Sequence, residues 1–156
     1  MKTLREGARS ETQEYGIASF VYRSRRPFHA QRIADVLRRP WPGVLRAKGL
    51  LYLASRLEFI SLFSLAGTVW QLGPMGWWRA VIPEDQWPDS PEVTAQIKAM
   101  WHPTFGDRRQ QIVIIGQRMD EPAIRAMLDG CLLTDAEVAE GKSAWLKYPD
   151  PFPRWA

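Results

Sequence analysis

The sequence is poor in residues that bind transition metals or cross-link chains. It holds one cysteine, Cys131, and two histidines, His29 and His102, among 156 residues. No disulfide can form within the chain, which is compatible with a reducing compartment. A zinc site would need these three side chains to converge, or carboxylates to assist them. The alternative for Cys131 is a small buried apolar residue, and we expect no metal site in this chain.

Long apolar runs are also missing. No stretch reaches the ~18 consecutive apolar residues of a membrane span. Residues 1–10 are charged and lack the apolar segment of a signal peptide. We therefore expect a soluble, cytoplasmic protein without a membrane partner.

Motifs that carry chemistry are absent too. The sequence contains no G-x-x-x-x-G-K-[ST] phosphate loop, no G-x-G-x-x-G, no H-E-x-x-H and no C-x-x-C. No nucleophile lies in a recognisable pattern with a base. We therefore predict no enzyme activity and no catalytic residue, no cofactor bound by this chain, and neither binding nor hydrolysis of GTP.

The residues that are present fit one globular domain. Apolar residues make up 46% of the chain, and eight tryptophans and 12 prolines favour a compact core with proline-rich connections. We assign residues 1–14 to a polar tail or linker remnant and residues 15–146 to the folded domain. Residues 147–156 are assigned to a proline-rich extended tail.

Apolar periodicity predicts both strands and helices. Alternating or β-branched runs predict strands at 17–23, 44–53, 59–65, 68–72 and 112–115. Helical spacing and capping residues predict helices at 28–39, 90–101 and 120–130, and a short one after a Thr134–Glu137 capping box. Residues 73–89 are expected to form a loop. In the second helix, Val93, Ile97, Met100 and Trp101 share a face that we expect to be buried.

This order of elements predicts the fold class. Strands and helices follow as β-α-β-β-β-α-β-α, which favours an α+β two-layer sandwich. We expect a ferredoxin-like variant with a sheet of four to five mostly antiparallel strands and helices on one face.

Positive charge is concentrated early in the chain. Residues 1–57 hold 12 lysines and arginines against four acidic residues, which fits either an acidic partner or a solvated surface. In the densest cluster, RSRRPFH at 23–29, Arg25, Arg26 and His29 would lie near a helix N-terminus that favours anions. The alternative is that Arg26 pairs with a nearby acid, Phe28 fills the core, and His29 is a surface or capping residue.

Two further groups complete the candidate partner-binding set. Arg46 and Lys48 alternate onto one face of their strand. Asp107 can hold a turn through a local backbone bond, and Arg108 and Arg109 then point to opposite faces. We predict that Arg25, Arg26, Arg46 and Lys48 form one patch. The full set is Arg25, Arg26, His29, Arg46, Lys48, Asp107, Arg108 and Arg109.

Five segments, in order, resemble the C-terminal domain of the CobW family. They are YGIASFVYRSRRPFHAQRI (15–33), WPGVLRAKGLLYLA (41–54), SLAG (64–67), GDRRQQIVIIGQRMD (106–120) and LDGCLLTDAE (128–137). The pieces RPFH, RAKG and GDRRQQIVIIG carry most of the resemblance. Members of this family are P-loop GTPases of zinc or cobalt delivery, and their phosphate loop and C-x-C-C metal motif lie in an N-terminal domain that this chain lacks.

The resemblance implies a non-catalytic interaction or regulatory module of a GTP-dependent metal chaperone. Its implied partners are a P-loop GTPase domain, in cis or in trans, and a metalloprotein client. Zinc, GTP and magnesium are expected only with that GTPase domain. The alternative function is a stand-alone nucleic-acid-binding domain that uses the basic N-terminal half, with tryptophans mixed among cations as stacking platforms. We do not favour nucleic acid, because Trp101 is expected in the core.

Overall fold

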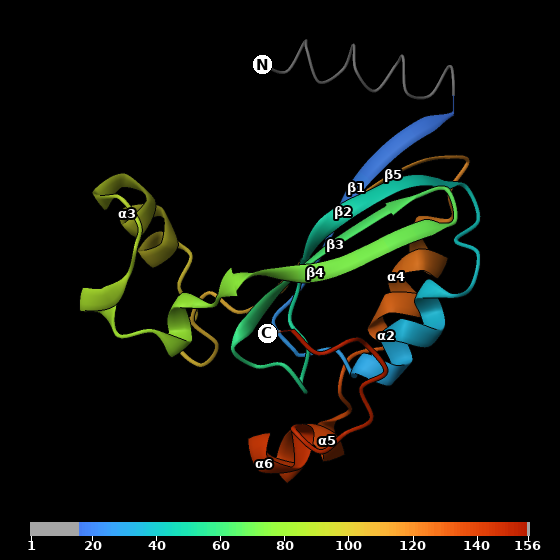
Figure 1. Cartoon of the computed structure of the whole chain (residues 1–156). Coiled ribbons are helices and arrows are strands. Elements are labelled where there is room, and N and C mark those ends of the chain that lie inside the picture. Colours follow the sequence, from blue (N-terminus) through green and yellow to red (C-terminus); the bar gives the residue numbers. More distant parts are fainter. Residues whose placement is uncertain (1–15, 156) are drawn as a thin grey trace.

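The computed structural model describes residues 16–155 (Figure 1). The strands are β1 (Ile17–Ser24), β2 (Val44–Leu51), β3 (Phe59–Ala66), β4 (Val69–Trp77) and β5 (Gln110–Gln117). The helices are α2 (Ala30–Leu37), α3 (Pro91–Ala99), α4 (Glu121–Asp129), α5 (Asp135–Glu140) and α6 (Lys142–Trp145), and the short turns η1 (Arg79–Val81) and η2 (Glu84–Gln86) precede α3. No helix in this part of the chain is long and apolar enough to cross a membrane.

The five strands form one sheet in the order β1-β5-β2-β3-β4, and every neighbouring pair is antiparallel. Because β5 lies between β1 and β2, those two strands run parallel to each other, and α2 makes the crossover that parallel strands require. The predicted α+β fold with a mostly antiparallel sheet is confirmed.

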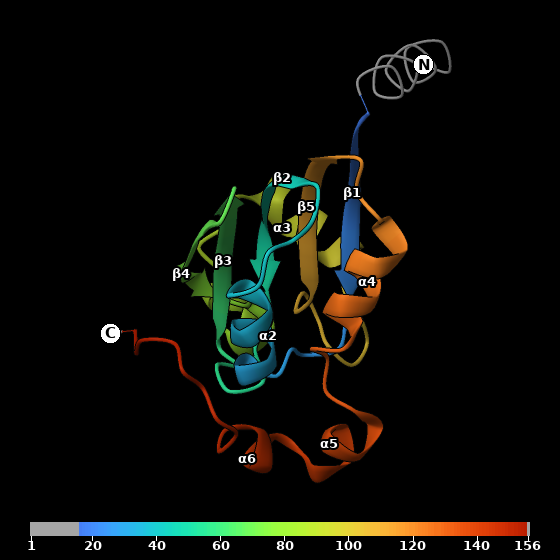
Figure 2. The ribbon, with the colours of Figure 1, turned by 90° about the vertical axis from the view of Figure 1, so that its right-hand side faces the viewer.

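Helices α2 and α4 pack side by side on one face of the sheet (Figure 2). α2 buries Ile33 and Leu37, and α4 buries Ile124 and Leu128, which are spaced three or four residues apart along one helical stripe. Strand side chains from the facing side of the sheet complete the core with Phe20, Phe63, Ile112 and Ile114. Cys131 belongs to this core and is buried, as predicted, and burial raises the pKa of its thiol to about 11.

A bulge in β2 changes the predicted alternation of that strand. The register between β2 and β5 shifts between Val44 and Arg46, so Leu45 is 49% exposed and does not share the buried face of Ala47 and Leu51. A bulge inserts one extra residue, which a strict period of two cannot foresee. Arg46 and Lys48 still lie together on the other face, as predicted.

Strand β4 is longer than the sequence indicated. It runs through Pro74 to Trp77, whereas residues 73–77 were expected to begin a loop. β4 is the edge strand of the sheet, and proline is tolerated at an edge because its missing N–H leaves no ladder bond unmade.

Residues 78–107, called the arm below, extend beyond the strand ends. They carry α3 on the side of the sheet opposite to α2 and α4 (Figures 1 and 2). The predicted helix start is confirmed, since Ser90 caps α3 through the N–H of Val93. Its predicted burial is wrong: Val93 and Trp101 are 41% and 39% exposed. The apolar stripe of this helix serves the arm itself, where Trp101 packs at a tilt against Trp87.

Two charged side chains hold the arm in place: Arg25 fastens it to the sheet, and Asp107 joins its two ends. The guanidinium of Arg25 donates to the carbonyl oxygens of Gly106 at 2.8 Å, Arg108 at 3.2 Å and Met100 at 2.8 Å. The carboxylate of Asp107 accepts from the backbone N–H groups of Arg79 and Ala80 at 2.8 and 2.9 Å. Asp107 therefore joins the two ends of the arm, which lie 27 and 28 residues apart, rather than holding a local turn.

Helix α5 has the predicted capping box, in which Thr134 accepts from the N–H of Glu137 and donates its own N–H in return. Glu137 is also bidentate with Arg32 of α2, at 2.8 and 2.6 Å. The hydrogen bond from Arg32 lowers the pKa of Glu137 to about 2, against the opposing effect of burial. This pair links α5 to the helix layer.

We expect this pair to make stability depend on acid. A carboxylate whose pKa is lowered by folding stabilises the protein fully above its unfolded pKa of about 4.3, and the contribution is lost as the pH falls toward 2. In urea titrations, Glu137→Gln should be less stable than the parent at pH 7, and the gap should close between pH 5 and 2. The control is Glu121→Gln, whose ion pair with Arg125 is exposed. A pH-independent gap for Glu137→Gln would contradict the assignment.

Candidate functional site

On the sheet face opposite to α2 and α4, α3 lies beyond the strand ends, and no helix covers the strands themselves in the described part of the chain (Figure 1). We call this face the open face and define it by alternate residues of four neighbouring strands. Its members are Val21, Arg23, Arg46, Lys48, Leu50, Leu62, Ser64, Gln111, Val113 and Ile115, which alternate with the buried residues and adjoin one another in register.

The open face exposes several apolar side chains, whereas a solvated sheet face is usually polar. Val113, Ile115 and Leu62 are 41%, 39% and 36% exposed. Antiparallel sheets with one solvated face normally alternate apolar inward with polar outward. Contiguous exposed apolar residues on such a face mark an interaction surface.

Two cations of the central strand β2 lie between the apolar residues of β5 and β3. Arg46 pairs in register with Ile115, and Lys48 with Val113. Neither cation has a hydrogen bond or ion pair to any residue in 16–155, and both are exposed. The two side chains are therefore available to an acidic partner.

The predicted single patch of Arg25, Arg26, Arg46 and Lys48 does not form. Arg46 lies beside Ile115, which pairs with Ser19 of β1. Arg25 is six residues further along the chain from Ser19, about 20 Å away at the rise of an extended strand. The sequence misjudged this because β5 enters between β1 and β2 and sets their relative register.

The RSRRPFH segment is mainly structural. Arg26 donates to the carbonyl of Leu133 at 3.0 Å and pairs with Asp135 at 2.8 Å, and Phe28 is fully buried. His29 is 9% exposed and stacks on Tyr148. Burial lowers the pKa of His29, and Arg32 lowers it further. The second interpretation of this segment, local pairing and core filling, is the one that the contacts favour.

In the GDRR turn, residues 106–109, the two arginines have different surroundings. Arg108 is 8% exposed and donates to the carbonyls of Phe105 and Thr104 at 2.7 and 3.1 Å. Arg109 donates to Gln111 at 2.9 Å and to the carbonyl of Asp107 at 2.8 Å. Arg108 thus belongs to the framework, while Arg109 lies at the border of the open face.

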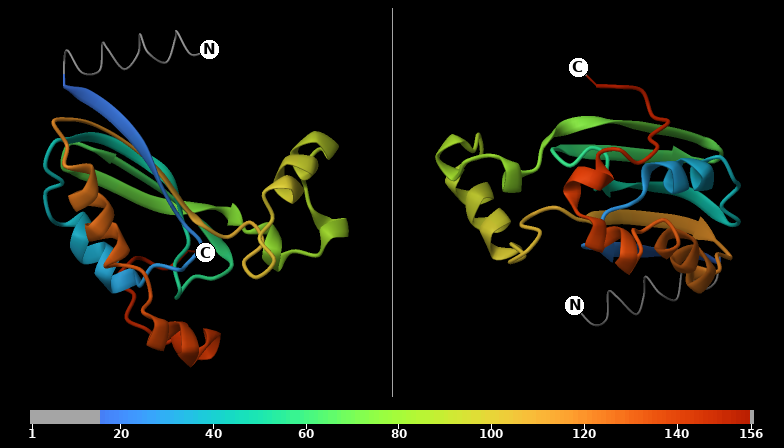
Figure 3. Two further views of the ribbon diagram at one scale, coloured as in Figure 1. Left: turned by 180° about the vertical axis from the view of Figure 1, so that it is seen from behind. Right: turned by 90° about the horizontal axis from the view of Figure 1, so that it is seen from below.

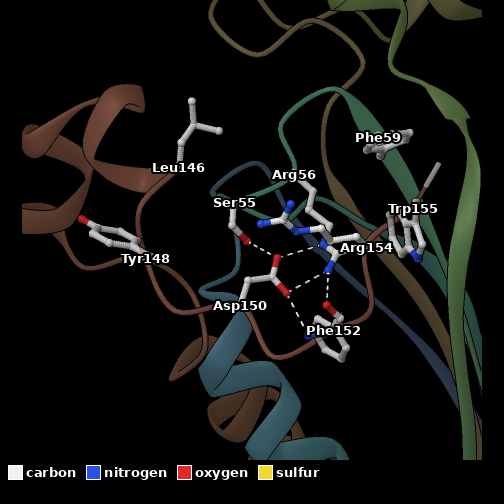
Figure 4. A pocket seen from close by; sticks show the side chains of 9 residues that line it. All are labelled: Ser55, Arg56, Phe59, Leu146, Tyr148, Asp150, Phe152, Arg154 and Trp155. Carbon is white, nitrogen blue, oxygen red and sulfur yellow. Dashed lines mark hydrogen bonds and ion pairs between the residues drawn. The ribbon is translucent and has the colours of Figure 1, made fainter.

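A pocket of about 400 Å³ lies under the C-terminal tail (Figure 4), but its central charges are already paired. Arg56 binds Asp150 through Nε at 2.8 Å and Nη2 at 3.0 Å, and donates to the carbonyls of Phe152 and Pro153, each at 2.6 Å. Ser55 donates to the same carboxylate. This arrangement fixes the tail along the body of the domain (Figure 3) and leaves no free polar group at its centre. Nothing in the sequence pattern signals the contact, because its partners are 94 residues apart.

Metal and base-stacking chemistry gain no support from the geometry. Residues 16–155 contain no group of three or more histidine, cysteine or acidic side chains that could hold a metal ion. None of the tryptophans is among the residues that define the open face. Trp41, Trp78 and Trp145 are buried, Trp87 packs at a tilt against Trp101, and Trp70 packs against Phe152. Trp77 and Trp155 each pack edge-on against Phe59.

Comparison with known families places the chain in one of them. Residues 17–132 match the model of the cobalamin synthesis protein cobW C-terminal domain. The chain belongs to the CobW C-terminal domain family. The match contains the whole sheet and stops before α5, so the Arg56–Asp150 contact lies partly outside it.

Related proteins are GTPases and zinc chaperones that are longer than this chain. It is 40% identical over 155 residues to zinc-regulated GTPase metalloprotein activator 1 of Dictyostelium discoideum, covering 97% of this chain and 32% of that protein. It is 30% identical over 141 residues to a zinc chaperone of Mycobacterium tuberculosis, covering 89% and 35%. The CobW C-terminal domain described here thus spans about a third of the length of these relatives.

A solved structure supports the fold. The Zn(II)-bound YjiA GTPase from E. coli aligns with a TM-score of 0.54 at 17% identity, covering 79% of this chain and 32% of that one. At this identity the likeness concerns the fold alone.

Proposed function

We propose that this CobW C-terminal domain is the non-catalytic interaction module of a GTP-dependent zinc chaperone. In this proposal its open face docks on a P-loop GTPase domain, in the same polypeptide or in a separate one. The observation that carries the proposal is the alignment of nearly the whole chain with one third of a zinc-regulated GTPase. GTP, magnesium and zinc would be bound by the GTPase domain, and a metalloprotein client would receive the metal.

The open face has the composition that such docking requires. Interfaces combine apolar side chains with polar and charged ones, and arginine is enriched among them. Val113, Ile115 and Leu62 provide exposed apolar contacts, and Arg46 and Lys48 on the central strand β2 provide cations between them. Cations of this kind steer and orient an acidic partner more than they add affinity. Arg26 is omitted from the surface, because it is already bound to Leu133 and Asp135.

Charge reversal on the open face tests the proposal. We expect Arg46→Glu/Lys48→Glu to weaken binding to the GTPase portion of the Dictyostelium relative by roughly tenfold or more, since like charges across an interface repel. Calorimetry with the GDP-loaded and the GTP-loaded GTPase measures the affinity, and circular dichroism checks that the variant is folded.

The matched control reverses two cations elsewhere. Lys142→Glu/Lys147→Glu makes the same change in net charge on exposed residues in and after α6. This control should bind like the parent. If both double variants bind equally weakly, the effect arises from net charge and not from the open face. If the open-face variant binds like the parent, the open face is not the docking surface.

A further inference from the structure

Three arginines meet where the open face adjoins the arm. Arg23 at the end of β1, Arg25 just after it and Arg109 just before β5 line one pocket of about 670 Å³, with Ser24, Gln111 and Met100 around them. The pairing of β1 with β5 brings the three arginines together, because Arg23 pairs with Gln111 and Ser24 pairs with Gln110. We call these residues the arginine pocket.

No carboxylate of residues 16–155 forms a hydrogen bond or an ion pair with any of the three guanidinium groups. The acid whose charge acts on Arg109 is Asp107, and it directs both carboxylate oxygens to the N–H groups of Arg79 and Ala80. Burial lowers the pKa of Arg109, and the charges of Arg25 and Arg23 lower it further against the opposing effect of Asp107. Three positive charges therefore share the pocket, and the carboxylate of Asp107 is already hydrogen-bonded to backbone N–H groups of the arm.

The unused hydrogen-bonding groups of the pocket are donors. Arg109 donates two of its five N–H groups, from Nε and Nη1, which leaves both of Nη2 and one of Nη1. Arg25 donates through both terminal nitrogens, which leaves Nε–H and at least one terminal N–H. Arg23 has no partner in residues 16–155, so all five of its N–H groups are unused. The side-chain oxygen of Gln111 already accepts from Arg109, so its amide N–H₂ remains.

We propose that the arginine pocket binds a phosphate group. A phosphate brings close to two negative charges and acceptor oxygens in several directions, which matches donors that converge from three side chains. A carboxylate has one charge and two oxygens in a plane, too few for this set. Arginine is the side chain best suited to hold phosphate through paired N–H groups. Met100 adds an apolar wall that could face the organic part of a phosphate ester.

The test uses the full chain with ¹⁵N label, inorganic phosphate as the first probe, phenyl phosphate as the second and acetate as the carboxylate probe, all at constant ionic strength. The Nε–H signals of Arg23 and Arg109 should shift and saturate with phosphate, and acetate should bind at least about tenfold more weakly. Tighter binding of phenyl phosphate than of phosphate would identify an organic phosphate as the ligand. Equal affinities would identify the inorganic ion.

Two variants make the result decisive. Arg23→Gln removes an exposed cation that holds no part of the described framework, and it should raise the phosphate Kd about tenfold. Arg39→Gln makes the same charge change at the exposed end of α2, on the helix side, and should leave the Kd within about twofold. The proposal is overturned if the Nε–H signals keep shifting without saturating as phosphate is added, or if both variants weaken phosphate binding equally. Either result would mean that phosphate is attracted only to a basic surface in general. Neither result bears on docking of a GTPase, which Arg46 and Lys48 test separately.

Discussion

Gly49→Ala is expected to destabilise the domain by at least about 3 kcal/mol, beyond the usual range for an overpacked core position. Gly49 lies in β2, and a methyl group there would come within 1.9 Å of the carbonyl oxygen of Gln111 and 2.7 Å of the Cα of Ile112. Both obstacles are backbone atoms of β5, so no side chain can move aside. The β2–β5 ladder would have to separate in the middle of the sheet.

Gly73→Ala is the matched control. Gly73 also lies in a strand, β4, but a methyl group there would meet nothing within 4 Å. Its free energy of unfolding, measured by urea denaturation, should stay within about 0.5 kcal/mol of the parent. Similar losses for the two variants would mean that the cost arises from alanine in a strand and not from the close approach of β2 and β5.

Asp150→Ala is expected to cost about 3–5 kcal/mol, because it leaves the Arg56 guanidinium buried without its counter-charge. The two side chains are only 10% and 16% exposed. Burial raises the pKa of Asp150, but hydrogen bonds from Arg56, Ser55 and the N–H of Phe152 outweigh it, so the pKa lies below its ordinary value. The substitution also releases the C-terminal tail, which limited proteolysis should detect as cleavage after Lys147.

An exposed pair of the same chemistry provides the comparison. Asp135 binds Arg26 at 2.8 Å, as closely as Asp150 binds Arg56, but the two side chains are 94% and 39% exposed. Asp135→Ala should therefore cost no more than about 1 kcal/mol. If the two alanine variants lose the same stability, burial does not set the strength of the Arg56–Asp150 pair.

The local elements were readable from the sequence because their causes are local. The α2 stripe of Ile33 and Leu37 follows the helical period, and the continuous apolar, β-branched run at 112–115 predicts β5. The caps of α3 and α5 depend on Ser90 and Thr134, which bond to residues three positions away. The resemblance to the CobW family also depended on local features, namely five short segments in a fixed order. The family comparison confirmed it.

The bulge in β2 and the extension of β4 escaped prediction because each depends on a neighbouring strand. Val44 and Arg46 change register against β5, and Pro74 is tolerated only because β4 has no neighbour on its outer side. The burial of α3 was misjudged for a related reason. An apolar stripe shows that a helix packs against something, but Trp101 found Trp87 within the arm instead of the sheet.

The sequence by itself determined which side chains are charged, which segments are helix or strand, and that no phosphate loop is present. Only the tertiary structure decided which cations are free. As charges, the six cations Arg25, Arg26, Arg46, Lys48, Arg108 and Arg109 look alike in the sequence. In the structure four of them, Arg25, Arg26, Arg108 and Arg109, donate to carbonyl oxygens or polar side chains, while Arg46 and Lys48 face solvent. The reason is that the hydrogen-bond acceptors of a guanidinium are set by the fold. For Arg25 and Arg26 they come from residues 75 to 109 positions away, and for Arg108 they come from its own turn. Neither kind of acceptor produces a periodic pattern in the sequence.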